Sequence, residues 1–376
     1  MLSLYIHIPF CVGKCRYCGF YSTTYSTGKA DEFISGLKNE ASMYRDDFIH
    51  RPFGSIYIGG GTPTVLSPLQ LGLLIRVIRE HFLIDDTVEF TIEANPNTVT
   101  SEKLSLLLAQ GVNRLSLGVQ SFSNGILQTL GRLHSGEQAA DAFRLARSAG
   151  FRNIGVDLIY GIPGQTATQW DETLGAAIAL KPEHVSAYSL SLDDGSQFKR
   201  EAEAGGFTMP DDEVIAAMYE YAVQTLNSAC YGHYEISNFS LPGYECRHNM
   251  NYWDRGEYLG LGPGAWSFIS GTRYSNISDT TEYSQRLSSG RSAIDAEETI
   301  GLVPSARETI LLGLRTMKGL DLHRFKMEFG EDLLRRLERN AVPLRDAGLI
   351  GLTEGRIRLT DRGILLSNEA LARLSV

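Results

Sequence analysis

The stretch Cys11-Val12-Gly13-Lys14-Cys15-Arg16-Tyr17-Cys18 places three of the chain's five cysteines within eight residues. Thiolates are the preferred ligands of soft metal centres, so a loop this short predicts a metal site. A structural zinc ion needs a fourth ligand. The candidates for it are distant in the sequence: His7, Cys230, Cys246 and His248. A [4Fe–4S] cluster bound by three cysteines leaves one iron open to an outside ligand, and we favour this cluster.

Short β-rich runs alternate with segments of helical periodicity from residue 2 to residue 227. The expected strands are Leu2–Ile8, Ser55–Ile58, Val88–Glu93, Arg114–Val119, Ile154–Tyr160 and Val185–Leu192. The expected helices are Asp31–Tyr44, Pro68–His81, Ser101–Gln110, Glu137–Ala149, Thr168–Leu180 and Asp211–Asn227. Such alternation is typical of βα units around a parallel sheet. It predicts an α/β fold, either an open doubly wound sheet or most of a barrel.

Glycine-rich and polar residues stand where four of these strands end. The second strand is followed by Gly59-Gly60-Gly61-Thr62-Pro63-Thr64, which no Gly-Lys-Ser/Thr follows, so it is not a phosphate-binding P-loop. Glu93 closes the third strand, Gln120 follows the fourth, and Asp157 lies near the end of the fifth. Because ligands of parallel α/β folds bind at the carboxyl ends of strands, these residues predict one common site.

The pattern Cys11-x3-Cys15-x-Tyr17-Cys18, followed by the Gly-Gly-Gly-Thr-Pro-Thr loop, resembles the radical S-adenosylmethionine (SAM) superfamily. The resemblance implies a partial (β/α)6 TIM-like barrel. It also implies that the open iron binds the amino and carboxylate groups of SAM, which the reduced cluster can cleave to a radical. By resemblance Gly60, Gly61 and Thr62 contact the methionyl part of SAM, and Arg132 pairs with its carboxylate. The other residues expected around SAM are Tyr5, Tyr17, Glu93, Gln120 and Asp157.

Within the superfamily the chain resembles the group related to oxygen-independent coproporphyrinogen III oxidase. The oxidase carries an extra N-terminal segment and a fourth cysteine two residues after the third. Here the cluster loop begins close to Met1, and Phe20 stands at the position of that cysteine. The HemW family of haem chaperones lacks both features and carries a His-Asn-x-x-Tyr-Trp motif, matched by His248, Asn249, Tyr252 and Trp253. The chain therefore resembles this family most, with the oxidase, an enzyme, as the alternative.

The His-Asn-x-x-Tyr-Trp motif has a physical interpretation as a haem site. His248 would be the axial ligand, Tyr252 and Trp253 would pack on the macrocycle, and Asn249 would orient the imidazole or a propionate. Cys246 is a second candidate axial ligand outside the motif. The alternative is a loop that seals the sheet's open edge, with His248 as a hydrogen-bonded core residue.

The chain divides into a predicted radical SAM core (1–240), a connecting region with the haem motif (241–300) and a C-terminal domain (301–376). In the connecting region we expect ordered loops at 247–253 and 260–266. The C-terminal pattern predicts helices over 305–316, 322–329 and 332–347, a hairpin over 351–360 and a last helix from 362. This is a small winged-helix-like α+β domain. It holds 13 Lys and Arg against 10 Asp and Glu, an excess too small to predict nucleic-acid binding.

Composition narrows the class of protein. The net charge of −9 argues against a nucleic-acid partner, and no apolar run is long enough to span a membrane. An odd number of cysteines without a signal peptide indicates a reducing compartment, the cytoplasm. The expected partners are haem and apo-haem acceptor proteins, respiratory enzymes at the membrane among them, and a homodimer is compatible with the family. The cluster and SAM would then support haem transfer or dimerisation.

Overall fold

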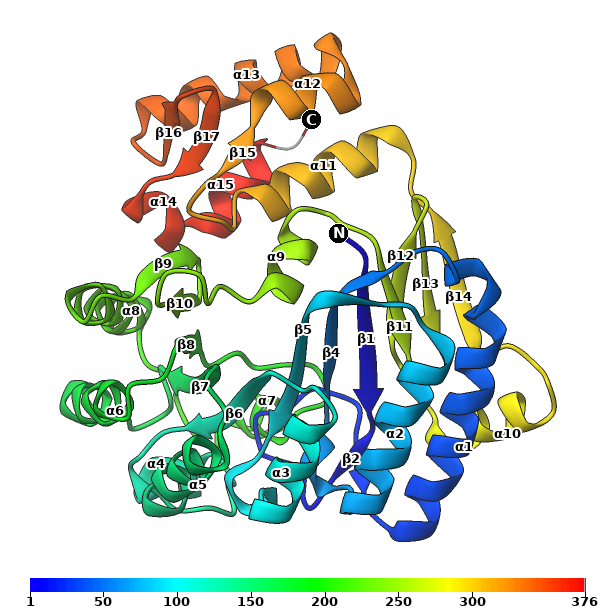
Figure 1. The fold of residues 1–376 in the computed structure, drawn as a ribbon. Helices are drawn as coiled ribbons and strands as arrows, with labels where there is room; N and C mark the ends of the chain where they lie inside the picture. Colours follow the sequence, from blue (N-terminus) through cyan, green and yellow to red (C-terminus); the bar gives the residue numbers. More distant parts are fainter. Residues whose placement is uncertain (375) are drawn as a thin grey trace.

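The computed structural model describes residues 1–374 and 376, and its centre is a twelve-stranded sheet (Figure 1). Six neighbouring strands run parallel and carry the predicted pattern. They are β1 (Ser3–Ile8), β4 (Phe53–Gly60), β5 (Ile84–Ala94), β6 (Arg114–Gln120), β7 (Ile154–Tyr160) and β8 (His184–Ser189). Each of the six predicted strands overlaps one of these strands. Two short strands, β2 (Phe10–Cys11) and β3 (Thr23–Thr24), pair beside the cysteine loop.

The sheet does not close into a barrel: β1 and β8 do not pair with each other, and each pairs with an additional strand instead. Strand β11 (Tyr258–Leu261) pairs parallel with β1, and three antiparallel strands continue from it. These are β12 (Trp266–Ile269), β13 (Thr272–Asn276) and β14 (Ile294–Thr299). The opposite edge ends in β10 (Asn238–Ser240) and β9 (Gly232–Glu235). The expectation of loops at 247–253 and 260–266 was wrong in part, because residues 247–253 form a helix. Residues 260–261 and 266 belong to strands, since 260–261 pair with β1 and Trp266 pairs with Ser275 of β13.

Helices cover the outer side of the parallel strands (Figure 1). The short helices α4 (Asn124–Thr129) and α7 (Gln197–Glu203) lie beside the cysteine loop, where Arg16 contacts Thr129 and Glu201. The helices that cover the strands are α1 (Thr27–Tyr44), α2 (Pro68–His81), α3 (Ser101–Ala109), α5 (Gly136–Ala149), α6 (Ala167–Ala179) and α8 (Asp212–Ser228), with short 3-10 turns at Asp46–Phe48, Pro63–Val65 and Pro96–Thr98. Three begin with the same capping box, in which a Ser or Thr and a Gln three residues later satisfy each other's backbone groups. The pairs are Ser67–Gln70, Ser135–Gln138 and Thr166–Gln169.

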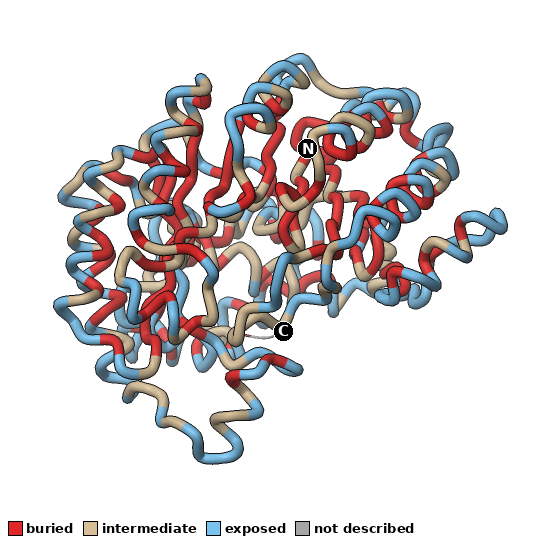
Figure 2. The backbone as a smooth tube through the Cα atoms, turned by 90° about the horizontal axis from the view of Figure 1, so that it is seen from below, coloured by how far each residue is buried: buried red, intermediate tan, exposed pale blue. Residues whose placement is uncertain are grey.

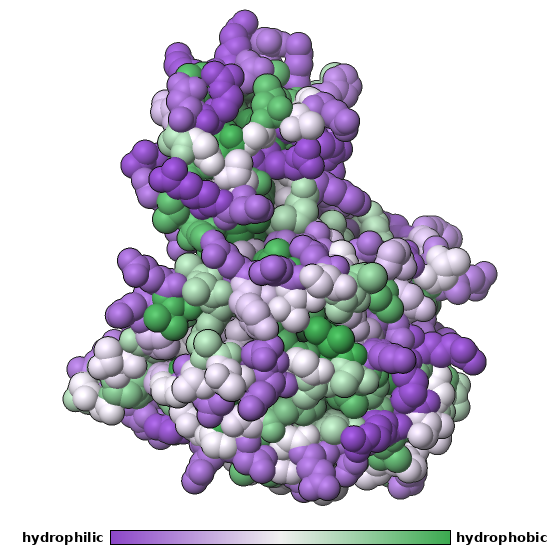
Figure 3. Space-filling model, turned by 90° about the vertical axis from the view of Figure 1, so that its left-hand side faces the viewer, coloured by the Kyte–Doolittle hydropathy of each residue, from purple (hydrophilic) through white to green (hydrophobic). Residues whose placement is uncertain are grey.

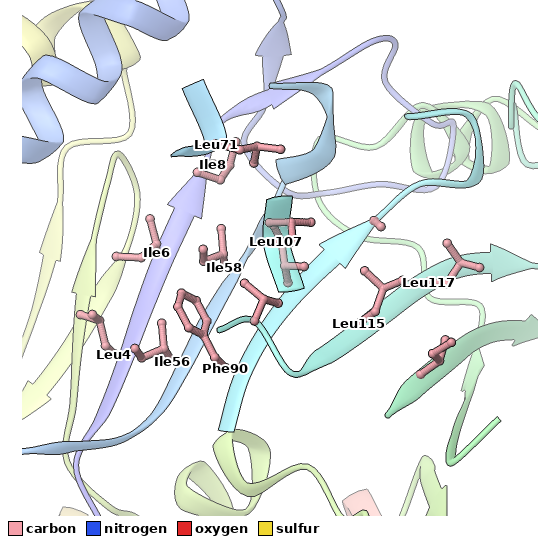
Figure 4. Close-up of a cluster of buried hydrophobic side chains, with 14 of the residues drawn as sticks. Leu4, Ile6, Ile8, Ile56, Ile58, Leu71, Phe90, Leu107, Leu115 and Leu117 are labelled. Carbon is pink, nitrogen blue, oxygen red and sulfur yellow. The ribbon is translucent and has the colours of Figure 1, made fainter. Parts of the chain in front are cut away.

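The hydrophobic core lies between this helix layer and the sheet. Ile6, Ile58 and Leu115 are fully buried, and Leu107 of α3 faces them from the helix layer (Figure 4). Figure 2 shows the buried residues running along the strands while the outer turns of the helices are exposed. Burying such side chains is the main stabilising contribution to the fold. Because apolar side chains alternate with polar ones along the strands, the opposite face of the sheet is left to polar groups.

The C-terminal domain is a separate lobe with a largely hydrophilic surface (Figure 3). It holds a three-stranded sheet of β15 (Leu320–Asp321), β17 (Arg356–Leu359) and β16 (Ile350–Thr353). Its helices are α11 (Leu302–Gly313), α12 (Leu322–Phe329), α13 (Glu331–Asp346), α14 (Asp361–Leu365) and α15 (Ser367–Leu374). The predicted helices and hairpin are therefore present. Among the described residues no helix combines the length and the apolarity needed to cross a bilayer.

The buried carboxyl of Glu40 joins segments that are far apart in the sequence. Its side chain on α1 accepts hydrogen bonds from the Tyr283 hydroxyl (2.6 Å) on α10 (Thr280–Ser288), from the Gly262 amide (2.9 Å) and from the Asn276 side chain. Burial raises the pKa of Glu40 to about 7, although these donors oppose the rise.

We predict that Glu40 makes the fold less stable as pH rises from about 4.5 to about 7. In that interval the folded chain keeps a proton that the unfolded chain has lost, so unfolding releases it. The loss of unfolding free energy should approach about 3 kcal/mol. Urea unfolding at pH 5 and pH 8 measures it, and Glu40→Gln should show a smaller pH difference than the wild type. Equal pH differences in the two proteins would contradict the prediction.

Candidate functional site

A cavity of about 520 Å³ opens at the carboxyl ends of the parallel strands and continues down inside the sheet. The cysteine loop forms its mouth, and polar residues of β5, β6, β7 and β8 form its walls. Of the residues predicted for the cluster and SAM, those that line this cavity are Cys11, Cys15, Cys18, Tyr17, Gly60, Gly61, Thr62, Glu93, Gln120, Arg132 and Asp157. Tertiary structure thus brings nearly the whole predicted set to one place.

The three loop cysteines are half-buried at the mouth, and all five cysteines lie in the described part of the chain as free thiols. Within the described residues no three His, Cys, Asp or Glu side chains stand close enough to hold a single metal ion. Cys11, Cys15 and Cys18 all line the same cavity, as three thiolates that share one cluster would have to.

Arg16, inside the cysteine loop, anchors the loop to the barrel. Its amide donates to the carbonyl of Leu130 (3.1 Å), and its guanidinium donates to the carbonyl of Thr129 (3.0 Å) and to the carboxylate of Glu201. The same guanidinium lies over the ring of Phe198, 4.8 Å from its centroid. These contacts fix the position of the cysteine loop through protein groups alone.

The glycine loop after β4 packs directly against the strand that carries Cys11. The amide of Gly61 donates to the carbonyl of Ile8 (2.7 Å), and the amide of Thr62 donates to the carbonyl of Phe10 (2.7 Å). A Cβ on Gly61 would lie 2.5 Å from the oxygen of Phe10, so only glycine permits this approach. The Thr62 hydroxyl also points at the Cys11 sulfur, 3.6 Å away. Because both amides already donate to backbone carbonyls, they hold the glycine loop against the cysteine loop and are not free to donate to a ligand.

Two carboxyl groups face the cavity from β5 and β7, the strands on either side of β6. Glu93 accepts from the Tyr57 hydroxyl (2.7 Å) and the Gly60 amide (3.2 Å), and burial raises its pKa to about 7. Asp157 accepts from the Ser186 hydroxyl at 2.7 Å, and burial raises its pKa too. Groups with such pKa values accept hydrogen bonds from amino or hydroxyl groups of a ligand and ionise when the ligand is cationic.

Arg132 reaches from the loop after α4 to the cluster thiols. Its guanidinium donates to the Cys15 sulfur (3.4 Å) and to the carbonyl of Gly118 (2.7 Å). Its Nε is buried and has no partner among the described residues. A cation with a spare donor beside one of the cluster thiols would suit the carboxylate of SAM. Gln120, which ends β6 in the left-handed region at φ 68°, also faces this space.

Tyr5 is the one predicted SAM residue that does not line the cavity. Its hydroxyl contacts Nδ1 of His7 (3.1 Å), and its ring lies near the rings of Tyr57 and His248. Tyr5 therefore lies on β1 among aromatic side chains, outside the wall of the cavity.

The haem motif forms a short helix, α9 (Arg247–Trp253), inserted into the amino-terminal end of the barrel. His248 is 1% exposed; its Nδ1 is 3.0 Å from the Ser55 hydroxyl, and its Nε2 is 3.0 Å from the Tyr252 hydroxyl. Burial, aided by the charge of Arg114, lowers the pKa of His248 to about 3. The imidazole is therefore neutral at every physiological pH, as a metal-ligating imidazole must be, but both ring nitrogens have partners here.

The other motif residues point in different directions. Asn249 lines the cavity, whereas Trp253 lies against the C-terminal domain, where the Arg315 guanidinium is 4.7 Å from its ring centroid. Cys246 is fully buried with its sulfur 3.6 Å from a Glu89 oxygen, and burial raises the pKa of its thiol to about 12. Of the motif, only Asn249 lies in the wall that a ligand in the cavity would meet.

Sequence reasoning missed several polar residues that line the cavity. They are Tyr57, Arg114, Ser116, His184, Ser186 and Tyr188. A signal existed in strand β6, where Arg114, Ser116, Gly118 and Gln120 alternate with three buried apolar residues. In a strand covered by helices on one side, such alternation marks the face that lines the interior.

We predict that Gly61→Ala abolishes most cluster binding while the barrel remains folded, because its Cβ would displace the carbonyl of Phe10. The measurement is iron and sulfide per chain after anaerobic reconstitution. Gly72→Ala is the matched control, since a Cβ there meets no atom within 4 Å. Full iron and sulfide content in Gly61→Ala would show that the close approach does not hold the cluster loop.

Comparison with known proteins agrees with this geometry. The chain matches the radical SAM superfamily over residues 5–177 and the HemN C-terminal domain over residues 305–366. Coproporphyrinogen III oxidase (HemN) from Escherichia coli, described as a radical SAM enzyme, has a TM-score of 0.87 at 25% sequence identity, covering 100% of this chain and 90% of that chain. The predicted partial barrel with a C-terminal domain is confirmed.

The sequence is more similar to proteins named haem chaperone HemW. The one from Lactococcus lactis is 36% identical over 371 residues, which is 99% of this chain and 96% of the relative. The one from Bacillus subtilis is 35% identical over 370 residues, with 98% of both chains covered. The predicted resemblance is thereby confirmed, and the chain belongs to the HemW family within the radical SAM superfamily.

Proposed function

We propose that this protein is a haem chaperone that binds a [4Fe–4S] cluster, SAM and haem and delivers haem to apo-haem proteins. The observation that supports it most is similarity to proteins named haem chaperone HemW along nearly the whole chain, haem motif included. Free cysteines support a reducing compartment, and we place the function in the cytoplasm. Respiratory proteins at the membrane are the acceptors we propose.

Cys11, Cys15 and Cys18 would hold the cluster, and the cavity beneath it would take SAM. Arg132 offers a cation to the carboxylate of SAM, while Glu93 and Asp157 offer acceptors to its amino and ribose groups. Bound to the open iron, SAM can supply a radical when the cluster is reduced. In a chaperone, the same site would couple the binding of the cluster and SAM to the binding of haem at its own site.

Haem binding at His248 requires a local rearrangement. Its Nε2 can coordinate iron only if the Tyr252 hydroxyl turns away. Helix α9 is also held from the C-terminal side: Arg255, just after the helix, pairs with Glu308 (3.1 Å) and donates to the Ser305 hydroxyl (2.7 Å), and Arg324 donates to the carbonyl of Asp254 (3.3 Å). We infer that the C-terminal domain controls how easily α9 opens.

The alternative function is oxygen-independent coproporphyrinogen III oxidase, which the structural similarity to HemN favours. Phe20 speaks against it, because this exposed side chain stands where the oxidase has a fourth cysteine. Formation of protoporphyrinogen by the reduced, cluster-loaded protein with SAM under anaerobic conditions would support the oxidase over the chaperone.

We predict opposite effects of two substitutions on haem affinity. His248→Ala should weaken binding of ferric haem by at least about tenfold, because the axial ligand is lost. Tyr252→Phe keeps the ring but frees Nε2, and should strengthen binding by about 2- to 10-fold. Absorbance titrations measure both and also report axial ligation. Unchanged affinity and Soret spectrum in His248→Ala would rule out His248 as the ligand.

We predict direct transfer of haem from the loaded protein to the apo form of a respiratory cytochrome. Transfer by contact depends on encounters, so its rate should rise with acceptor concentration. Transfer through free haem would be limited by dissociation, and its rate would level off at a value independent of the acceptor. Stopped-flow absorbance separates the two cases, and serum albumin loaded with haem serves as the passive control.

A further inference from the structure

The floor of the cavity carries a buried cation whose hydrogen-bonding capacity is not used. Arg114, the first residue of β6, is 2% exposed and lines the cavity. Its Nε and Nη1 are buried and find no partner within the described residues. A guanidinium has five N–H donors, and leaving buried donors unpaired costs free energy. Arg114 is therefore a donor group that a ligand could satisfy.

The charge of Arg114 is balanced by a nearby carboxylate that has other hydrogen-bond partners. Glu89 is its ionic neighbour, but both Glu89 oxygens accept backbone amides of α9, from His248 (3.0 Å) and Arg247 (3.0 Å). The Cys246 thiol nearby is neutral, since burial raises its pKa to about 12. A guanidinium has five N–H donors in a planar fork that suits carboxylates, so Arg114 keeps donors for a second carboxylate beside Glu89.

His184 supplies another unused donor at the same floor. The Tyr234 hydroxyl accepts the amide of Cys246 (3.3 Å) and lies 2.7 Å from His184 Nε2. Because the Tyr234 oxygen already accepts the amide, we assign the hydroxyl proton to the contact with His184, so that Tyr234 donates to Nε2. The proton of the neutral imidazole is then on Nδ1. That Nδ1 is buried without a partner among the described residues. Burial and the charge of Arg114 lower the pKa of His184, so the ring is neutral.

Gly155 on β7 leaves open a space between the guanidinium of Arg114 and the unpartnered Nδ1 of His184. A Cβ built on Gly155 would lie 3.4 Å from Nη2 of Arg114, 3.4 Å from Nδ1 of His184 and 3.6 Å from the Ser116 hydroxyl. Three polar atoms from β6 and β8 thus converge beside Gly155, which lies two residues before Asp157 on β7. Because Gly155 has no side chain, the point on which these atoms converge is left free of protein atoms.

We propose that Arg114, His184 and Gly155 form a carboxylate subsite at the cavity floor, and that it receives a propionate of the tetrapyrrole. The identity of the ligand rests on the proposed function; the open space beside Gly155 does not. Asn249 of the haem motif lines the same cavity, and Arg114 is near enough to His248 to lower its pKa. The subsite therefore lies beside the predicted axial ligand and below the residues expected around SAM.

The test compares ferric protoporphyrin IX with its dimethyl ester, which has the same macrocycle without carboxylates. The full-length protein should bind the free acid at least about tenfold more tightly than the ester. Arg114→Gln removes the cation, and Gly155→Ala fills this space while keeping every donor at ordinary contact distance. Either change should reduce the preference to within about twofold. Arg144→Gln, at an exposed arginine on α5, should keep the full preference.

Each outcome decides between the two proposals. Wild-type protein that binds both porphyrins equally, or a preference that survives in Gly155→Ala and in folded Arg114→Gln, would overturn the subsite alone. Wild-type protein that binds neither porphyrin would overturn the proposed function and the subsite with it. If Arg114→Gln does not fold, Gly155→Ala decides, because alanine fits there without a clash and strands favour it over glycine.

Discussion

The carboxylate of Glu89 holds the amino terminus of α9 inside the barrel, and the arrangement of the site depends on this contact. Its two oxygens accept the amides of Arg247 and His248, so the first turn of α9 is capped by a residue of β5. This places His248 among Tyr5, Tyr57 and Ser55, closes the amino-terminal end of the cavity and gives Arg114 its counter-charge. The position of α9 at this end of the barrel thus depends on an interaction between segments far apart in the sequence.

The inner face of the parallel strands is the second organising feature. Because the outer face packs on helices, polar residues on alternating positions can only face the interior. The cavity therefore holds buried carboxyls with raised pKa values at its upper level and a buried arginine with a neutral histidine at its floor. The upper level suits a ligand that carries amino and hydroxyl groups. The floor suits an anion, so one cavity offers two chemically distinct levels.

The structure also relates the haem motif to both domains. Helix α9 is capped by β5 on one side and contacted by Arg315 and Arg324 of the C-terminal domain on the other. Its histidine is neutral because it is buried, and it is ready to ligate only after a hydrogen bond to Tyr252 is broken. In the proposed haem site, access of haem to His248 would therefore depend on the conformation of α9. The C-terminal domain would then have a role in the proposed function that its weak positive charge did not suggest.

Local sequence determined the cysteine loop, the glycine loop, the six parallel strands with their helices and the family, because each depends on spacing within one short segment or on the period of burial. Tertiary structure alone decided that residues 247–253 form a helix within the barrel, that Tyr5 turns away from the cavity, and that Arg114, Gly155 and His184 meet. Those features depend on contacts between strands and on a partner, Glu89, that lies 158 residues before Arg247 in the chain. No local pattern encodes such a distance, because burial and pairing across a sheet are set only when the whole chain has folded.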